Sequence, residues 1–220
     1  MSSVLDIIGP VMIGPSSSHT AGAVRLGRIA RELLAVEPVR AEVTLYGSFA
    51  KTYRGHGTDR ALAAGIMGMA ADDARLRGSL DFARERNLEI TFTPSDTAVD
   101  HPNTALIHLD GAGGEHVEVL GSSVGGGQIV VTRIDGLAVR VTGLRTTFIV
   151  LHRDAPGLIA AVTDVLAESG ANICDFSLAR ERRGGEAVMT IEVEGDLDDR
   201  VERRIKRLRD VTASIMLRPV

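Results

Sequence analysis

The segment 14–22, GPSSSHTAG, combines three consecutive serines, a histidine and a threonine directly before an expected helix. Free backbone N–H groups and the macrodipole favour an anion at a helix N-terminus. The hydroxyls add hydrogen-bond donors, and the imidazole adds a donor or a base. A carboxylate or a phosphate would fit there; the alternative is a serine-rich cap that only starts the helix. The candidate residues of this segment are Ser16, Ser17, Ser18, His19 and Thr20.

A second candidate is the stretch 47–60, GSFAKTYRGHGTDR, which follows an expected strand and precedes an expected helix. We interpret it as a loop, in a position where active sites often form. His56 stands between two glycines, which gives a ligand the close access that a general acid or base needs. The alternative is that Thr58 or Asp59 caps the next helix and that His56 is an ordinary loop residue.

Two further turns contain polar or flexible residues. In 100–104, DHPNT, Pro102 restricts the chain and Asn103 could bind a carboxylate or an amine, although a simple Asx-type turn is the favoured interpretation. In 121–128, GSSVGGGQ, consecutive glycines permit a backbone nest for an anion or a plain hairpin loop. Neither a Walker A loop nor a dinucleotide-binding glycine fingerprint is present in the sequence.

Near the C-terminus, a turn at 153–157 (RDAPG) and a strand start at 172–174 (NIC) are expected to lie close together and could clasp an amino acid. Turn chemistry alone is the alternative. The residues proposed for this effector site are Asp154, Ala155, Pro156, Gly157, Asn172 and Ile173. Cys174 is expected to be a small buried apolar residue.

The elements that would position these residues form two groups. The C-terminal pattern predicts the order βαββαβ of a ferredoxin-like unit, with strands at 146–152, 172–180, 187–193 and 211–217 and helices at 158–169 and 196–208. The N-terminal pattern predicts one α+β domain. Its helices are expected at 17–35, 58–69 and 75–86, and its strands at 40–46, at 89–93 and, antiparallel, within 104–141. A composition shift at 142–145 separates domains 1–143 and 146–220.

Composition excludes several functions. The 220 residues carry a net charge of −4 and no tryptophan, which argues against a broad nucleic-acid surface or a base-stacking platform. No apolar run is long enough to span a membrane, and Met1–Asp6 lack a signal-peptide pattern, so a cytoplasmic protein is expected. The single cysteine excludes an internal disulfide and a self-contained iron-sulfur cluster, which takes three or four thiolates, and no metal site is expected on this chain.

Four motifs occur in an order that resembles the beta chain of iron-sulfur-dependent L-serine dehydratase. They are 14–20 (GPSSSHT), 55–59 (GHGTD), 101–104 (HPNT) and 123–127 (SVGGG). The resemblance covers nearly all of residues 1–141, and 146–220 resemble an ACT domain. It implies an α+β beta-chain domain, similar to the allosteric substrate-binding domain, followed by the ACT unit.

The resemblance also implies an activity and a partner. A [4Fe-4S] cluster held by an alpha chain would bind L-serine, a base would remove the α-proton, water would leave, and the aminoacrylate would decompose to pyruvate and ammonia. Residues 16–20 would line the substrate pocket, with Thr58, Asp59 and Asn103 as further substrate contacts. His56, or alternatively His19, would be the acid or base. An amino-acid effector at the ACT domain and homodimerisation through that domain are expected as well.

Two other functions remain open at this point. A chain of this kind could be a sensor of serine or phosphate without catalysis, because its N-terminal domain also resembles the allosteric domain beside the ACT domain of some phosphoglycerate dehydrogenases. It could also be an ACT-containing scaffold that only assembles. The retained Gly-His-Gly-Thr-Asp stretch at 55–59 and the absence of a dehydrogenase domain favour the dehydratase.

Overall fold

The computed structural model describes residue 12 and residues 14–219, and the chain divides into two compact units, Met1–Asp135 and Gly136–Val220. Each unit is described by itself. The leader-free N-terminus expected at Met1–Asp6 lies outside the described residues. In the part that the structure describes, no helix is long and apolar enough to cross a membrane.

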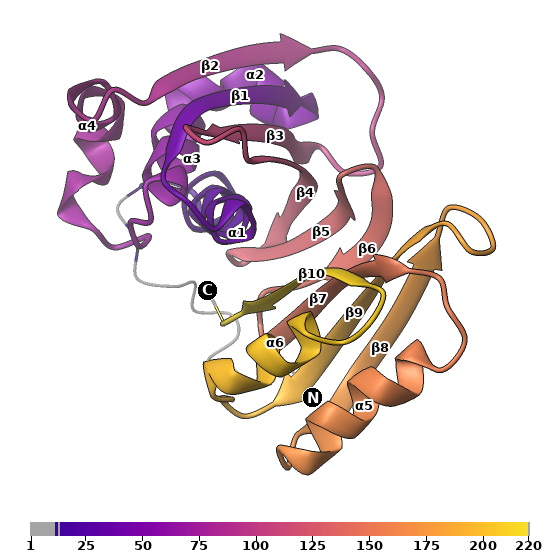
Figure 1. Ribbon diagram of the computed structural model, residues 1–220. Helices are drawn as coiled ribbons and strands as arrows, with labels where there is room; N and C mark the ends of the chain where they lie inside the picture. Colours follow the sequence, from indigo (N-terminus) through magenta and orange to yellow (C-terminus); the bar gives the residue numbers. More distant parts are fainter. Residues whose placement is uncertain (1–11, 13, 220) are drawn as a thin grey trace. The chain divides into compact units, whose positions relative to one another are not determined.

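The first unit is built on a mixed sheet in which the strands run in the order β2-β1-β3-β4-β5. β1 pairs with β2 in parallel and with β3 antiparallel, and β3, β4 and β5 follow one another as antiparallel neighbours. The sheet curves around α1 (Figure 1). The strands span β1 Pro38–Tyr46, β2 Glu89–Ser95, β3 Asn103–Gly111, β4 His116–Gly125 and β5 Gln128–Ile134.

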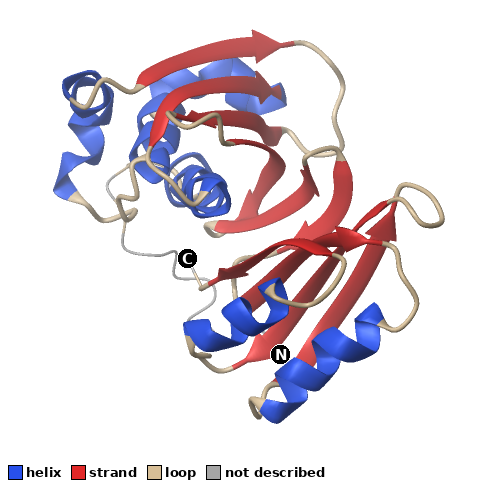
Figure 2. Ribbon diagram, in the orientation of Figure 1, coloured by secondary structure: helices blue, strands red, loops and turns tan. Residues whose placement is uncertain are grey.

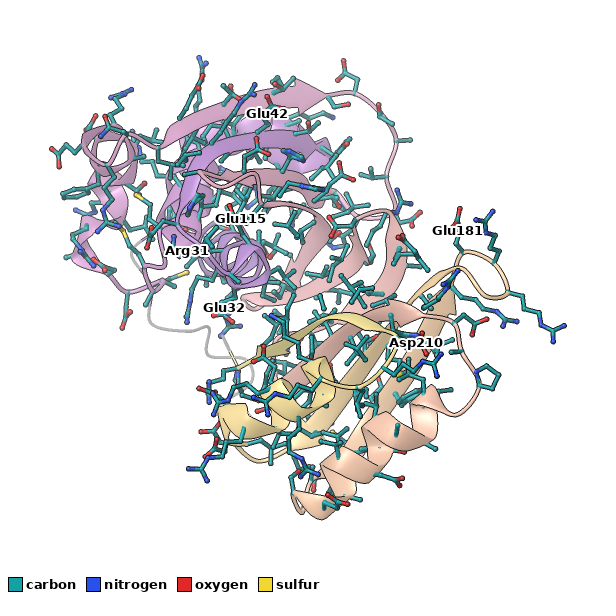
Figure 3. All side chains as sticks on the ribbon, in the orientation of Figure 1. Arg31, Glu32, Glu42, Glu115, Glu181 and Asp210 are labelled. Atoms are coloured by element: carbon teal, nitrogen blue, oxygen red, sulfur yellow. The ribbon has the colours of Figure 1, made fainter. Side chains whose placement is uncertain are left out.

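The strands alternate between core and surface, as a sheet with one covered face requires. On β1, Ala41, Val43 and Leu45 are buried, whereas Glu42 between them projects from the surface (Figure 3). This alternation fixes the register of β1 against β3, because a slip of one residue would turn every apolar side chain outward.

Helices cover one face of this sheet. They are α1 Ala23–Leu34, preceded by a π-helical turn at Ser18–Gly22, then α2 Gly47–His56, α3 Thr58–Ile66 and α4 Ser79–Glu85, which continues a 3₁₀ turn at Ala74–Gly78. The helices expected at 17–35, 58–69 and 75–86 are therefore present, with the last one divided between two helix types. The loop expected at 47–60 is wrong, because residues 47–56 form α2.

Two glycines allow α1 and α3 to cross at backbone contact. A Cβ atom on Gly65 would lie 2.1 Å from the carbonyl oxygen of Val24, and one on Gly27 would lie 2.6 Å from that of Leu62. This close crossing holds the N-terminal end of α1, and with it the polar segment 16–20, against the helices that carry His56 and Asp59.

The second unit has the order β7-α5-β8-β9-α6-β10, as the sequence pattern predicts, with both helices on one face of its sheet (Figure 2). Its strand order is β10-β7-β9-β8, all antiparallel between neighbours. Val162 and Leu166 of helix α5 belong to the same buried apolar cluster as Phe148 and Ile191 of the sheet. The bounds are β7 Thr146–Arg153, α5 Leu158–Glu168, β8 Asn172–Arg180, β9 Glu186–Glu194, α6 Asp199–Lys206 and β10 Val211–Leu217.

One further strand, β6 (Leu137–Val141), falls within the second unit and contacts β8 and β9. The domain limits 1–143 and 146–220 stay a prediction. The expectation of a buried Cys174 is wrong: its side chain is exposed on β8, which is an edge strand, and its thiol donates a hydrogen bond to the Glu192 carbonyl over 3.3 Å.

Candidate functional site

The polar segment 16–20 folds into the start of a helix, but with a wider turn than an α-helix. The amide of Gly22 donates to the carbonyl of Ser17 over 3.0 Å, five residues back, and the amide of Thr20 donates to that of Ser16 over 2.8 Å. Single π turns of this kind are frequent at functional sites. The turn places His19 and Thr20 inside the unit, whereas Ser16, Ser17 and Ser18 remain half-buried at its edge.

His19 is the centre of the polar cluster. Its side chain is only 8% exposed, and both ring nitrogens have hydroxyl neighbours. Nδ1 lies 3.3 Å from Ser16 Oγ, while Nε2 lies 3.2 Å from Thr52 Oγ1 and 3.4 Å from Ser48 Oγ. The imidazole is therefore held by hydrogen bonds on both sides, which fixes its orientation.

The two candidate histidines are neighbours. The rings of His19 and His56 meet edge to face with their centroids 4.7 Å apart, and Phe49 packs on His19 at 5.2 Å. Burial, and after it the charge of His56, lowers the pKa of His19 below its ordinary value. His19 is thus buried and favoured in its neutral form, whereas His56, at the last position of α2, is exposed.

Ser48 and Thr52 were missed as site residues when the stretch was interpreted as a loop. They lie four positions apart on α2 and so share one face of that helix, which is the face that meets His19. The available signal was the spacing of two hydroxyl residues at i and i+4 before a histidine at i+8, which places all three on one helix face.

The two remaining motifs join the same cluster. The amide of Ser48 donates to the carbonyl of Pro102 over 2.6 Å, and Asn103 Nδ2 reaches the Ser123 carbonyl at 3.5 Å. Ser123 in turn packs against Gly22, where a Cβ atom would lie 2.0 Å from its Oγ. The structure therefore brings together the motifs at 14–22, 47–59, 101–104 and 121–127.

Three buried polar atoms in these motifs lack a hydrogen-bond partner among the residues the structure describes: Thr58 Oγ1, Asn103 Oδ1 and Ser123 Oγ. Asp59, by contrast, is buried with one oxygen accepting from the Arg60 amide over 2.9 Å. Buried polar atoms without partners are uncommon in proteins and are found where a ligand or water completes the set.

A cleft of about 560 Å³ opens beside the cluster. Its walls include Thr20, His56 and three arginines, which are Arg54, Arg60 and Arg77, and no acidic side chain lines it among the described residues. The cleft combines positive charge with an exposed imidazole, which suits an anionic ligand such as a carboxylate. None of these three arginines was among the site residues expected from the sequence.

In the second unit, the two expected effector segments lie at opposite ends of the sheet. Asp154 accepts from the Gly184 amide over 3.0 Å and from Arg180 over 2.9 Å, and these bonds, the first more than the second, lower the pKa of Asp154. Asn172 donates to Glu194 over 2.9 Å.

The expectation that these segments lie close together within one chain is therefore wrong. β7 and β8 run parallel, with β9 between them. On β9, the partner of Arg153 is Glu186 and the partner of Asn172 is Glu194. These two partners lie roughly 25 Å apart along the strand. Ala155 and Pro156 lead to Gly157, whose φ of 86° lets the chain turn into α5.

The two units together define a class of protein: an α+β unit with a buried cluster of histidine and hydroxyl side chains, followed in the sequence by a ferredoxin-like unit. The serine dehydratase beta chain model matches residues 3–133, and the ACT domain model matches residues 146–210. The chain belongs to the serine dehydratase beta chain family and carries an ACT domain.

Similar proteins have related names. The probable L-serine dehydratase beta chain of Bacillus subtilis is 44% identical over 95% of this chain and 94% of its own length. The L-serine dehydratase beta chain of Peptoniphilus asaccharolyticus is 34% identical over 92% of each chain. A D-3-phosphoglycerate dehydrogenase of Synechocystis is 26% identical over 53% of this chain but only 21% of its own length.

Proposed function

We propose that this chain is the beta subunit of an L-serine dehydratase, which converts L-serine into pyruvate and ammonia together with an alpha subunit. The observation that carries the proposal is that four motifs meet in one polar cluster, in which residues of two of them contact His19, beside a cleft of positive charge. The two beta-chain relatives, which cover nearly the whole chain, support the substrate.

The histidine pair has the properties that acid–base catalysis of this reaction needs. His56 is exposed at the cleft and can reach a substrate, whereas His19 is buried, neutral and oriented by hydroxyl groups. Removal of an α-proton needs a positioned base, and departure of the hydroxyl needs a proton. We assign these proton transfers to the pair His19 and His56.

The remaining site residues would bind the substrate. Thr58 and Asn103 each have a buried oxygen available for a ligand within the described structure. Asp59 has one carboxylate oxygen engaged by the Arg60 amide, so the other would serve an ammonium group. The hydroxyls at the edge of the cluster complete the set, namely Ser16, Ser17, Ser18 and Thr20.

The [4Fe-4S] cluster does not fit the residues of this chain. Such a cluster takes three or four thiolates, and the chain has one cysteine, Cys174, exposed on β8 of the second unit. In the described part of the chain no three His, Cys, Asp or Glu side chains gather as a metal site. We therefore propose that the alpha subunit supplies all the cluster ligands, and that this chain binds substrate and moves protons.

The ACT domain would bind an amino-acid effector with the residues 154–157, Asn172 and Ile173. Because the two segments are far apart in one chain, two chains would combine them, with β8 as the pairing edge. Ile173 and Phe176 on β8 are each 37% exposed, an apolar edge that favours association. The homodimer is thus proposed to form through the ACT domain.

The activity test is anaerobic reconstitution with a cognate alpha chain. The pair should produce pyruvate from L-serine, each chain alone should not, and His56→Ala and His19→Gln should each lower kcat by at least about a hundredfold, the effect expected for an acid or base. His116→Ala, at an exposed site on β4, is the matched control. Serine binding by this chain without pyruvate from the pair would instead support a sensor.

A further inference from the structure

The stretch 49–54 contains a threonine whose contacts determine which nitrogen of His19 carries the proton. Thr52 Oγ1 lies 2.8 Å from the Ser48 carbonyl oxygen and 3.2 Å from His19 Nε2. A carbonyl oxygen can only accept, so the Thr52 hydroxyl donates its single proton to the backbone carbonyl oxygen of Ser48. Toward His19, the Thr52 oxygen is then left to accept, and Nε2 has to carry a hydrogen.

The other side of the ring agrees with this assignment. The backbone amide of His19 points at Ser16 Oγ over 3.5 Å, so that this oxygen accepts from the amide and has its own proton free. Ser16 Oγ is also 3.3 Å from His19 Nδ1. In a neutral imidazole with hydrogen on Nε2, Nδ1 is the acceptor, and the Ser16 hydroxyl is the donor that faces it.

We propose that Thr52 is a positioning residue that holds His19 in the Nε2–H tautomer, so that the basic nitrogen Nδ1 faces the Ser16 hydroxyl. Ser48 Oγ, at 3.4 Å from Nε2, can donate or accept and therefore imposes no preference. The catalytic meaning of this arrangement rests on the function proposed above, whereas the tautomer itself is a property of this chain.

The consequence is a direction for proton movement. Ser16 lies half-buried at the edge of the cluster, and His19 lies behind it. When Nδ1 carries no hydrogen, Ser16 can relay a proton: its oxygen accepts one proton and its hydroxyl passes its own proton to Nδ1. The resulting imidazolium is stabilised by Thr52, which accepts from Nε2–H on the opposite side of the ring. With the other tautomer, Nδ1 could not accept the proton.

The ring nitrogens of histidine can be observed directly. A long-range ¹H–¹⁵N spectrum of the labelled full chain separates the two neutral tautomers and the imidazolium by their nitrogen shifts, and His19→Gln identifies which of the six histidines is His19. We expect the Nε2–H pattern at neutral pH. A Nδ1–H pattern, or an imidazolium, in the unmodified chain would overturn the proposal.

Two variants test whether Thr52 is the cause. Thr52→Val keeps the shape but removes the acceptor, so the ratio of the Nε2–H to the Nδ1–H form should fall roughly fivefold, the effect of one net hydrogen bond. Thr52→Ser should restore it. Unchanged tautomers in Thr52→Val, with the other histidine signals in place, would also overturn the proposal.

The second unit offers a matched control. Thr163 on α5 makes the same kind of bond from its hydroxyl to a carbonyl four residues back, that of Ile159, over 3.0 Å. Thr163→Val should leave every histidine signal unchanged. In the assembled enzyme, Thr52→Val should lower kcat more than it changes KM, and Thr52→Ser should restore kcat. If the assembled enzyme makes no pyruvate, the dehydratase function fails, while the spectrum still decides the tautomer.

Discussion

The imidazoles of His19 and His56, 37 positions apart in sequence, meet edge to face with centroids 4.7 Å apart. One is buried and the other is exposed. The sequence left open which of the two histidines acts as acid or base. Because the rings are in contact, a substitution at one histidine also changes the surroundings of the other. Because the two rings are in contact, we expect the effects of single substitutions at the two positions not to add independently.

The buried member of the pair gives a prediction about pH and stability. Burial lowers the pKa of His19 in the folded chain, so the unfolded chain binds more protons in mildly acidic solution. The contribution of His19 to stability is complete above its unfolded pKa of about 6.5 and is lost as pH falls through the lower folded pKa. In His19→Gln this loss is absent.

The measurement is the free energy of unfolding by urea between about pH 7.5 and about pH 5. The difference between the unmodified chain and His19→Gln should shrink toward acidic pH. His116→Gln, on the surface of β4, should follow the unmodified chain. Parallel curves for the unmodified chain and His19→Gln would contradict the burial of a neutral imidazole.

The helix crossing gives a prediction about packing. Gly65→Ala would place a Cβ atom 2.1 Å from the Val24 carbonyl oxygen, against backbone that has no side-chain freedom. We expect a loss of about 2–3 kcal/mol in the free energy of unfolding, as for other overpacked positions. Gly55→Ala is the matched control, because it lies within α2 with nothing within 4 Å of the added Cβ; it should stabilise the chain by about 0.5–1 kcal/mol. Equal effects of the two would refute the close crossing.

The cleft gives a prediction about substrate binding. Replacing Arg60 or Arg77 with glutamine removes one positive charge from its wall, so KM for L-serine in the assembled enzyme should rise roughly three- to tenfold with little change in kcat. Added salt should reduce the difference. Arg200→Gln, on the exposed side of α6, should leave KM unchanged. If all three variants behave alike, the cleft does not hold the carboxylate.

The apolar edge of the second unit gives a prediction about assembly. Phe176→Glu places a charge on the exposed edge strand β8, where pairing of two chains would bury it. The dissociation constant of the homodimer, measured by sedimentation equilibrium, should rise by roughly tenfold or more. Ile159→Glu replaces an exposed apolar residue on α5 of the same unit and should not change it. If Ile159→Glu weakened the dimer and Phe176→Glu did not, the interface would lie on the helices and not on β8.

The sequence alone determined the second unit almost completely. Its strands at 172–180 and 211–217 were expected with the bounds that the structure shows, because alternating and helical spacing of apolar residues is a local signal that needs no knowledge of distant contacts. The single cysteine likewise argued against an iron-sulfur cluster held by this chain alone. Through the resemblance, residues of three motifs, 14–20, 55–59 and 101–104, were assigned to one substrate site.

Only the tertiary structure decided how those motifs are used. Helix α2 has one fully buried large side chain, Phe49, and a glycine at each end, so its apolar residues show no clear helical period. Its form depends on packing against β1 and β3. Through that packing, Ser48 and Thr52 reach His19. In the second unit, β7 and β8 run parallel, so Asp154, after the end of β7, and Asn172, at the start of β8, lie at opposite ends of the sheet. Strand order and helix packing are set by contacts between distant residues, which local spacing does not encode.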